Sequence, residues 1–186
     1  MHYSTFVIIG RDADPESAVA TALEPFDENL EGQPYRDYLD APDIQRMAAH
    51  YDIPPTDLAG LARKMRDWRG CEGGVDARGL YAVTTCNRDG KWDWYEIGGR
   101  WNGYIRGSKR NVITARALHR SPHLHKCLPY YLVTPDGRWL ESESRLSWGS
   151  PETAADRRNN RRWLAQVRRV LKQYSDCKVV CVDIHP

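Results

Sequence analysis

The sequence contains no long hydrophobic run. Its first apolar stretch, residues 6–9, is followed by Gly10, Arg11 and Asp12, which end the run after the length of one strand. A signal peptide and a membrane-spanning helix both need a longer apolar segment. We therefore expect neither, and we expect no membrane partner.

Cysteine is scarce, and its pattern is not that of a disulfide framework. The five cysteines are odd in number and include no C-x-x-C pair. Because disulfides are rare where glutathione keeps thiols reduced, we expect free thiols in a protein of the cytoplasm. With 41% hydrophobic and 28% charged residues, the chain is expected to be globular.

Acidic residues are absent from one long segment. Residues 97–135 contain seven basic side chains and no Asp or Glu, whereas residues 1–60 contain twelve acidic and three basic side chains. The acidic segment could pair with the basic one inside the fold, or the basic segment could face an anion such as a nucleic acid. The net charge of only +2 favours internal pairing or a protein partner.

Periodicity predicts both helices and strands. Residues 3–9 and 178–184 read as buried strands, and residues 153–174 show the longest helical pattern. Also predicted are helices near 15–23, 43–51 and 58–68, connectors at 24–42 and 70–79, and hairpins of 80–85 with 91–97 and 130–134 with 138–141. This order predicts an α+β fold with a largely antiparallel sheet of hairpins and helices packed mainly on one face. We expect a single domain, residues 1–186, in which residues 40–70 could form a helical appendage.

The most distinctive segment is residues 91–101, Lys-Trp-Asp-Trp-Tyr-Glu-Ile-Gly-Gly-Arg-Trp. In a strand, Trp92 and Trp94 would share one face, and with Arg100 they would form a binding platform for aromatic rings or anions. Alternatively, the segment is a packed aromatic hairpin in which Arg100 pairs with a nearby carboxylate such as Asp93. The candidate binding residues are Trp92, Trp94, Tyr95, Arg100, Trp101, Arg106, Lys109 and Arg110.

Several short motifs lie between residues 85 and 185. They are Thr85-x-Asn87, the paired runs Lys-Trp-Asp-Trp-Tyr and Ile-Gly-Gly-Arg-Trp, Thr-Pro-Asp-Gly-x-Trp at 134–139, and Val-Asp-Ile-His at 182–185. Together they resemble an uncharacterised family of small proteins from bacteriophages, prophages and bacterial genomes. The resemblance covers roughly residues 70–186, and the sequence departs from it at Cys86 and around residues 106–126. It implies a phage or prophage origin and no particular mechanism.

Two groups of residues could carry chemistry, although neither is a convincing catalytic set. Cys181, Asp183 and His185 share one strand face and could bind a metal or form a nucleophile–base set, but a half-buried strand shows the same pattern. The second group is the set that an enzyme acting on nucleotides or nucleic acid would use: Asp93, Arg100, Asp183 and His185.

A histidine-rich segment and an arginine-rich helix complete the candidates. His119, His123, His125 and Cys127 suit zinc by type, but Pro122 breaks the helix that would align the first two. We therefore expect no metal, and we expect no cofactor. Six arginines between residues 157 and 169 could lie along phosphates or form the solvent face of an amphipathic helix.

These observations favour a binding protein over an enzyme. We expect a non-enzymatic protein that engages a host protein or a protein–nucleic-acid complex in the host cytoplasm, as anti-CRISPR-like inhibitors of host defence do. Nucleic acid is expected as a partner only within such a complex. The alternative is the enzyme described above, which would be favoured if its four side chains met in one pocket.

Overall fold

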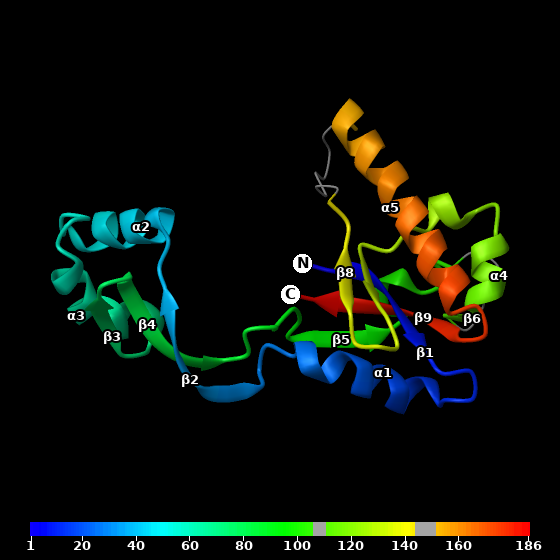
Figure 1. Ribbon diagram of the computed structural model, residues 1–186, viewed down its shortest axis with the longest axis horizontal. Coiled ribbons are helices and arrows are strands. Elements are labelled where there is room, and N and C mark those ends of the chain that lie inside the picture. The colour runs from blue at the N-terminus through cyan, green and yellow to red at the C-terminus, as the bar shows by residue number, and fades with distance from the viewer. Residues whose placement is uncertain (106–110, 144–151) are drawn as a thin grey trace. The chain divides into compact units, whose positions relative to one another are not determined.

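The computed structural model describes residues 1–105, 111–143 and 152–186 (Figure 1). The chain forms two compact units: residues Met1–Glu28 with Asp89–Pro186, and residues Asn29–Arg88. Residues 40–70 lie inside the second unit, which also contains a sheet. The predicted α+β class is confirmed. Within the described residues, no helix combines the length and the apolar composition that crossing a membrane requires.

The first unit is built on a six-stranded sheet. Its strands are β1 (Tyr3–Ile9), β5 (Trp94–Ile97), β6 (Val112–Thr114), β7 (Tyr131–Val133), β8 (Trp139–Glu141) and β9 (Lys178–His185). The strand order is β5-β9-β1-β7-β8, and β6 also pairs with β9. Only β1 and β7 are parallel, so the sheet is largely antiparallel, as predicted. Residues 179–184 are all buried, which explains the almost continuous apolar sequence of β9.

Helices cover both faces of this sheet, whereas the sequence predicted them mainly on one face. They are α1 (Pro15–Leu23), α4 (Ala115–Arg120) and α5 (Ala154–Gln173), with short 3-10 helices at Glu24–Phe26, Gly99–Trp101 and Leu124–Lys126. Successive strand residues point to opposite faces. Phe6 and Ile8 therefore share a core with Trp163 of α5, while Val7 shares the other core with Leu23 of α1. Figure 1 shows α1 on one side of the sheet, with α4 and α5 on the other.

The longest helix begins where the sequence predicts. The Thr153 hydroxyl accepts from the backbone N–H of Asp156, and the Asp156 carboxylate accepts from the backbone N–H of Thr153, which is a complete capping box. Trp163, Val167 and Leu171 form the buried stripe of α5. The predicted hairpin of residues 130–134 with 138–141 is also confirmed, as β7 and β8.

The second unit has its own sheet and its own core. The sheet contains β2 (Glu31–Tyr38), β3 (Gly73–Asp76) and β4 (Gly79–Cys86), in the antiparallel order β2-β4-β3, and the helices are α2 (Ala41–Tyr51) and α3 (Leu58–Arg69). Met47 of α2, Met65 of α3 and Leu80 of β4 are fully buried together. Gly73 allows this packing, because a Cβ there would lie 2.4 Å from the Cβ of Met65.

Three predictions of secondary structure and pairing are wrong. Residues 80–85 do not form a hairpin with 91–97, because β4 pairs with β2 and β3 in the second unit, whereas β5 pairs with β9 in the first. The predicted connectors at 24–42 and 70–79 contain strands β2 and β3. The strands β2 and β5 pair with partners that are distant in sequence, and the short β3 shows almost no strand pattern of its own, so the local turn residues were misleading.

The expected pairing of the acidic first segment with the basic 97–135 segment is not found among the described residues. None of Arg100, Arg120 and Lys126 forms an ion pair there, and Arg116 pairs with Asp176. Acidic residues of the first segment instead pair within the second unit. Asp37 and Asp43 both bind Arg69, at 2.8 and 3.0 Å.

Candidate binding surface

One edge of the first unit brings together β1, β5 and β9. In the β5–β9 pair, Trp94 lies opposite His185 and Glu96 lies opposite Asp183, and in the β1–β9 pair Ser4 lies opposite Asp183. Directly paired residues of antiparallel strands point to the same face of a sheet. The side chains of these strands that share the face of Asp183 therefore form one surface, close to both chain ends (Figure 1).

The buried side chain of Asp183 contacts two of the segments that form this surface. Its side chain is only 1% exposed, and its Oδ2 atom accepts from the backbone N–H of Arg100 at 2.9 Å. The Nδ1 atom of His2 lies 3.0 Å from the same oxygen and 3.1 Å from Oδ1. A buried carboxylate needs such partners, so Asp183 fixes both the chain start and the turn before Arg100.

The glycine pair of the Ile-Gly-Gly-Arg-Trp run is explained by this turn. Gly98 and Gly99 have φ angles of +79° and +47°. A Cβ on Gly99 would lie 2.5 Å from the Cβ of Asp183, and a Cβ on Gly98 would lie 2.2 Å from the Nδ2 atom of Asn111. Only glycine combines these dihedral angles with such close approach, so the motif encodes a tight turn packed on Asp183.

The solvent-exposed part of this surface contains aromatic side chains. Trp94 is 44% exposed, and its ring meets the ring of His2 edge-on at a centroid distance of 5.8 Å. The Nδ1 atom of His185 lies 2.9 Å from the Oδ1 atom of Asp93, with side chains 40% and 39% exposed. Arg100 is exposed and forms no ion pair in the described part of the chain. We call His2, Asp93, Trp94, Arg100 and His185 the β5–β9 surface.

Other residues of the predicted binding set are structural. Trp92 is buried, and its Nε1 atom donates to the Leu23 carbonyl at 2.9 Å. Tyr95 packs edge-on against Trp92 in the same core. Trp101 packs against the other core. Arg106, Lys109 and Arg110 lie outside the described residues.

The predicted strand faces and the predicted ion pair therefore need correction. Trp92 and Trp94 do not share a face, because β5 begins only at Trp94 and Trp92 forms an isolated bridge with Asp27. Arg100 forms no ion pair with Asp93 or with any other carboxylate of the described residues, and Asp93 binds His185. The aromatic segment is thus half core and half surface.

The four residues named for an enzyme are neighbours, but they do not form an open catalytic set. Asp93 and His185 are in contact, whereas Asp183 is buried beneath the turn and is bound by the backbone of Arg100. Cys181 shares the face of Asp183 but is buried, and burial raises the pKa of its thiol to about 12. A thiol with that pKa remains protonated at neutral pH and is a poor nucleophile.

The histidine-rich segment does not form a ligand set in the structure. The Nδ1 atom of His119 lies 3.2 Å from the Arg168 carbonyl oxygen, and Cys127 is buried. Among residues 1–105, 111–143 and 152–186, no group of three or more His, Cys, Asp and Glu side chains is arranged to hold a metal ion.

His2 is the contributor that the sequence did not identify. It lies one position before β1, and the register of β1 with β9 brings it beside Asp183 and His185. The sequence pointed to His2 only indirectly. Residues 3–9 and 178–184 both read as buried strands, and the pairing of these two strands places His2 beside Asp183. Comparison with models of known protein families, with curated proteins and with solved structures found no match for this chain.

Proposed function

We propose that this chain is a non-enzymatic binding protein that docks on another protein through the β5–β9 surface. The observation that carries the proposal is the position of Trp94, a large aromatic side chain left 44% exposed on a paired strand. Tryptophan and arginine are the side chains that most often dominate the energy of protein interfaces. Here Trp94 and Arg100 occupy the same edge of the first unit.

The rigidity of the surface supports this role. The backbone of Trp94 belongs to the β5–β9 ladder, and the neighbouring N–H of Asp93 donates to the His185 carbonyl at 2.9 Å. The Arg100 backbone is fixed by Asp183. Side chains presented from an ordered backbone lose less conformational entropy on binding, which favours recognition by a preformed surface.

The class of partner follows from the resemblance of residues 70–186 to phage and prophage proteins. We propose a host protein, alone or in a complex with nucleic acid, in the cytoplasm of a bacterial host. Inhibition of a host defence system, as by an anti-CRISPR protein, is the function that this class of partner implies.

The test is affinity capture from a bacterial lysate with three forms of the full chain, each with and without nuclease treatment. The wild type and a Leu30→Ala control are expected to retain the same specific protein, because Leu30 is also exposed but lies in the second unit. Trp94→Ala is expected to bind this protein with an affinity lower by roughly 30-fold or more, which is the effect of removing a hot-spot residue. Equal capture by Trp94→Ala would contradict the proposal.

A second candidate function rests on the contact between His185 and Asp93. A carboxylate that binds one imidazole nitrogen orients the ring and supports its use as a general base. With Arg100 nearby to bind a phosphate, the pair could act on a nucleotide or nucleic acid. Turnover of nucleotides or oligonucleotides by the wild type, lost in His185→Gln, would establish this function, and no turnover would leave binding as the function.

A further inference from the structure

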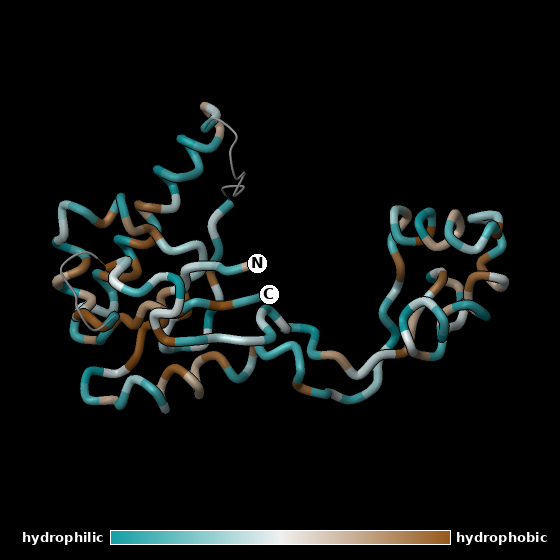
Figure 2. Tube along the Cα trace, turned by 180° about the vertical axis from the view of Figure 1, so that it is seen from behind, coloured by the Kyte–Doolittle hydropathy of each residue, from teal (hydrophilic) through white to brown (hydrophobic). Residues whose placement is uncertain are grey.

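The two halves of α5 differ in burial. Every buried residue of the helix lies between Trp163 and Leu171, and residues 154–162 contain none. Figure 1 shows this first half extending away from the sheet, and Figure 2 shows it as mostly hydrophilic. The first half is therefore stabilised by its capping box, by continuation of the helix and by a few polar contacts, such as that of the Asn159 amide with the Glu143 carbonyl oxygen, and its arginines are exposed.

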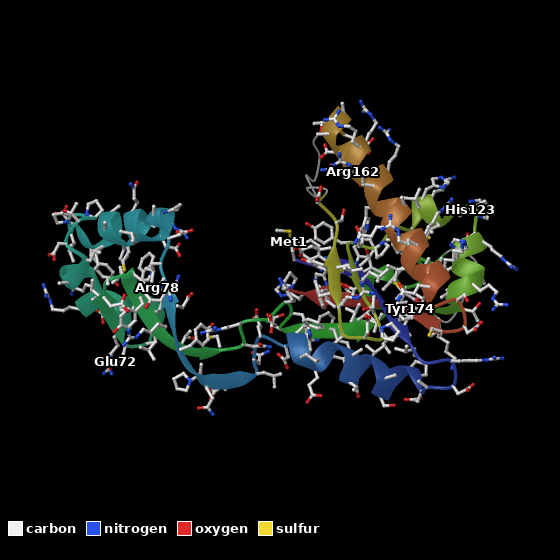
Figure 3. All side chains as sticks on the ribbon, viewed as in Figure 1. Met1, Glu72, Arg78, His123, Arg162 and Tyr174 are labelled. Atoms are coloured by element: carbon white, nitrogen blue, oxygen red, sulfur yellow. The ribbon has the colours of Figure 1, made fainter. Side chains whose placement is uncertain are left out.

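A stripe of one charge runs along the exposed side of α5. All of its members are exposed: Arg157, Arg158, Arg161, Arg162, Arg168, Arg169 and Lys172. At 3.6 residues per turn they fall within an arc of about 140°, opposite the arc of the buried stripe. We call these seven residues the basic stripe. Figure 3 places Arg162 on the half of α5 that extends from the sheet.

Within the part of the chain that the structure describes, the basic stripe has no ion-pair partner. The two remaining segments, 106–110 and 144–151, contain no Asp or Glu. The one acid of α5, Asp156, belongs to the capping box. Solvent-exposed helix faces commonly mix both signs at i,i+4 spacing, because like charges at that spacing repel. An anionic partner would relieve this repulsion.

A cavity extends the basic surface beyond α5. It has a volume of about 390 Å³ and lies between the helix and the 3-10 turn at Leu124–Lys126. Its polar lining includes His125, Lys126, Arg157, Asn160 and Arg161, with Glu152 as the one acid. The Glu152 carboxylate accepts from the Asn160 amide at 3.0 Å. The basic side chains in this lining outnumber the acidic one, which suits a phosphate group.

We propose that the basic stripe binds the phosphate backbone of a nucleic acid. Six of its seven members are arginines, whose planar guanidinium groups bind phosphate oxygens in pairs. The stripe is about 23 Å long from Arg157 to Lys172, so it reaches several consecutive phosphates. It includes no apolar side chain that could insert into a lipid surface, which argues against a membrane as the partner.

The contact is electrostatic and does not read sequence. Its affinity for free nucleic acid at physiological salt is in the non-specific range, with a Kd of roughly 10⁻⁴ to 10⁻⁶ M. Such binding adds to the affinity for a protein that already carries nucleic acid. The inference uses residues other than Trp94 and Arg100 and does not depend on the β5–β9 surface.

Fluorescence anisotropy with a labelled DNA duplex and a labelled RNA strand of about 20 nucleotides tests the proposal, between about 50 and 200 mM salt. The wild type is expected to bind duplex with a steep salt dependence. In Arg158→Gln/Arg162→Gln, the slope of log K against log salt should become shallower by about 2, because two phosphate contacts are lost. Glutamine is a good helix former, so α5 should remain intact, which circular dichroism checks.

The matched control is Arg63→Gln/Lys64→Gln, which removes two exposed charges from α3 in the second unit. It is expected to keep the wild-type slope. The proposal is overturned if the wild type fails to bind either nucleic acid at low salt, or if the control weakens binding as much as the stripe variant. Stripe-dependent binding to phosphatidylserine vesicles or to polyglutamate without binding to nucleic acid would also overturn it.

Discussion

Arg69 in α3 and Arg162 in α5 are both surface arginines, but their surroundings differ. Arg69 bridges Asp37 and Asp43 within the second unit, whereas Arg162 has no acidic partner in the described part of the chain. Four arginines of the second unit form ion pairs within it, namely Arg36, Arg46, Arg66 and Arg69, whereas no arginine of α5 forms an ion pair among the described residues. A paired charge contributes to the stability of its own fold, while an unpaired row of one sign indicates a binding role.

The comparison treats the second unit as a separately folded part of the chain. That unit must then be stabilised by its own hydrophobic core. Met65→Ala removes a fully buried side chain from that core and should destabilise it by about 2–5 kcal/mol. Hydrogen exchange should accelerate in α2 and α3 more than in β9. Val75→Ala, at an exposed position of the same unit, serves as the control, and equal exchange in both variants would break the comparison.

In the first unit, the buried carboxylate of Asp183 is the group whose removal should lower stability most clearly. Asp183→Ala leaves the Arg100 N–H and the His2 ring without their acceptor, at an expected cost of about 1–3 kcal/mol. Chemical denaturation measures it. Asp93→Ala, which removes an exposed partner of His185, should cost less than about 1 kcal/mol. Comparable losses would show that Asp183 is not a buried anchor.

Substitution of each arginine tests the comparison directly. Arg69→Ala should lower the stability of the fold, whereas Arg162→Ala should not. Arg69→Ala should destabilise the second unit by about 1 kcal/mol, since it breaks two ion pairs. Arg162→Ala should leave stability unchanged or raise it by up to about 0.5 kcal/mol, because it relieves repulsion with Arg158. Matched urea titrations of the two variants measure both values, and a loss on removing Arg162 would contradict the description of the basic stripe.

The smallest expected effect is a change in how stability depends on pH, and it comes from one carboxylate in each unit. The hydrogen bonds from Thr134 and Tyr174 lower the pKa of Asp136 to about 2, and the hydroxyl of Tyr38 is the main cause of a lowered pKa for Asp76. Each pKa is lower in the folded state than in the unfolded chain, where it is about 4. Each carboxylate therefore stabilises the fold above pH 4, and this contribution is lost as pH falls through the folded pKa.

Substitution by asparagine separates the two contributions. In Asp136→Asn, the loss of stability of the first unit between about pH 4 and 2 should become shallower. Asp76→Asn should have the same effect on the second unit. Acid titration followed by amide NMR signals of each unit measures both, and an unchanged profile in either variant would contradict the assigned hydrogen bonds.

Several elements were predictable because their signals are local. Tyr3–Ile9 forms a strand over the range that its β-branched run predicts, and the Pro135-Asp136-Gly137 turn joins β7 to β8 as its residues require. The capping residues Thr153 and Asp156 likewise set the start of α5. Each of these features depends on side chains a few residues apart.

The candidate site was predictable only in part. The sequence singled out Trp94, Arg100, Asp183 and His185, but it also selected Trp92 and Tyr95, which are core residues. Strand alternation could not separate Trp92 from Trp94, because the alternation begins only where β5 pairs with β9. His2 had no local signal at all. Its role depends on contacts with residues more than 180 positions away.

The sequence by itself determined the α+β class, the glycine pair before Arg100 and the basic residues that form the exposed stripe of α5. These follow from residue type and short-range spacing, which need no knowledge of distant partners. The tertiary structure decided which strands pair, which half of the aromatic segment is buried, and that Asp183 is an anchor. Those outcomes depend on long-range packing and on the desolvation of buried groups, and no local pattern encodes either.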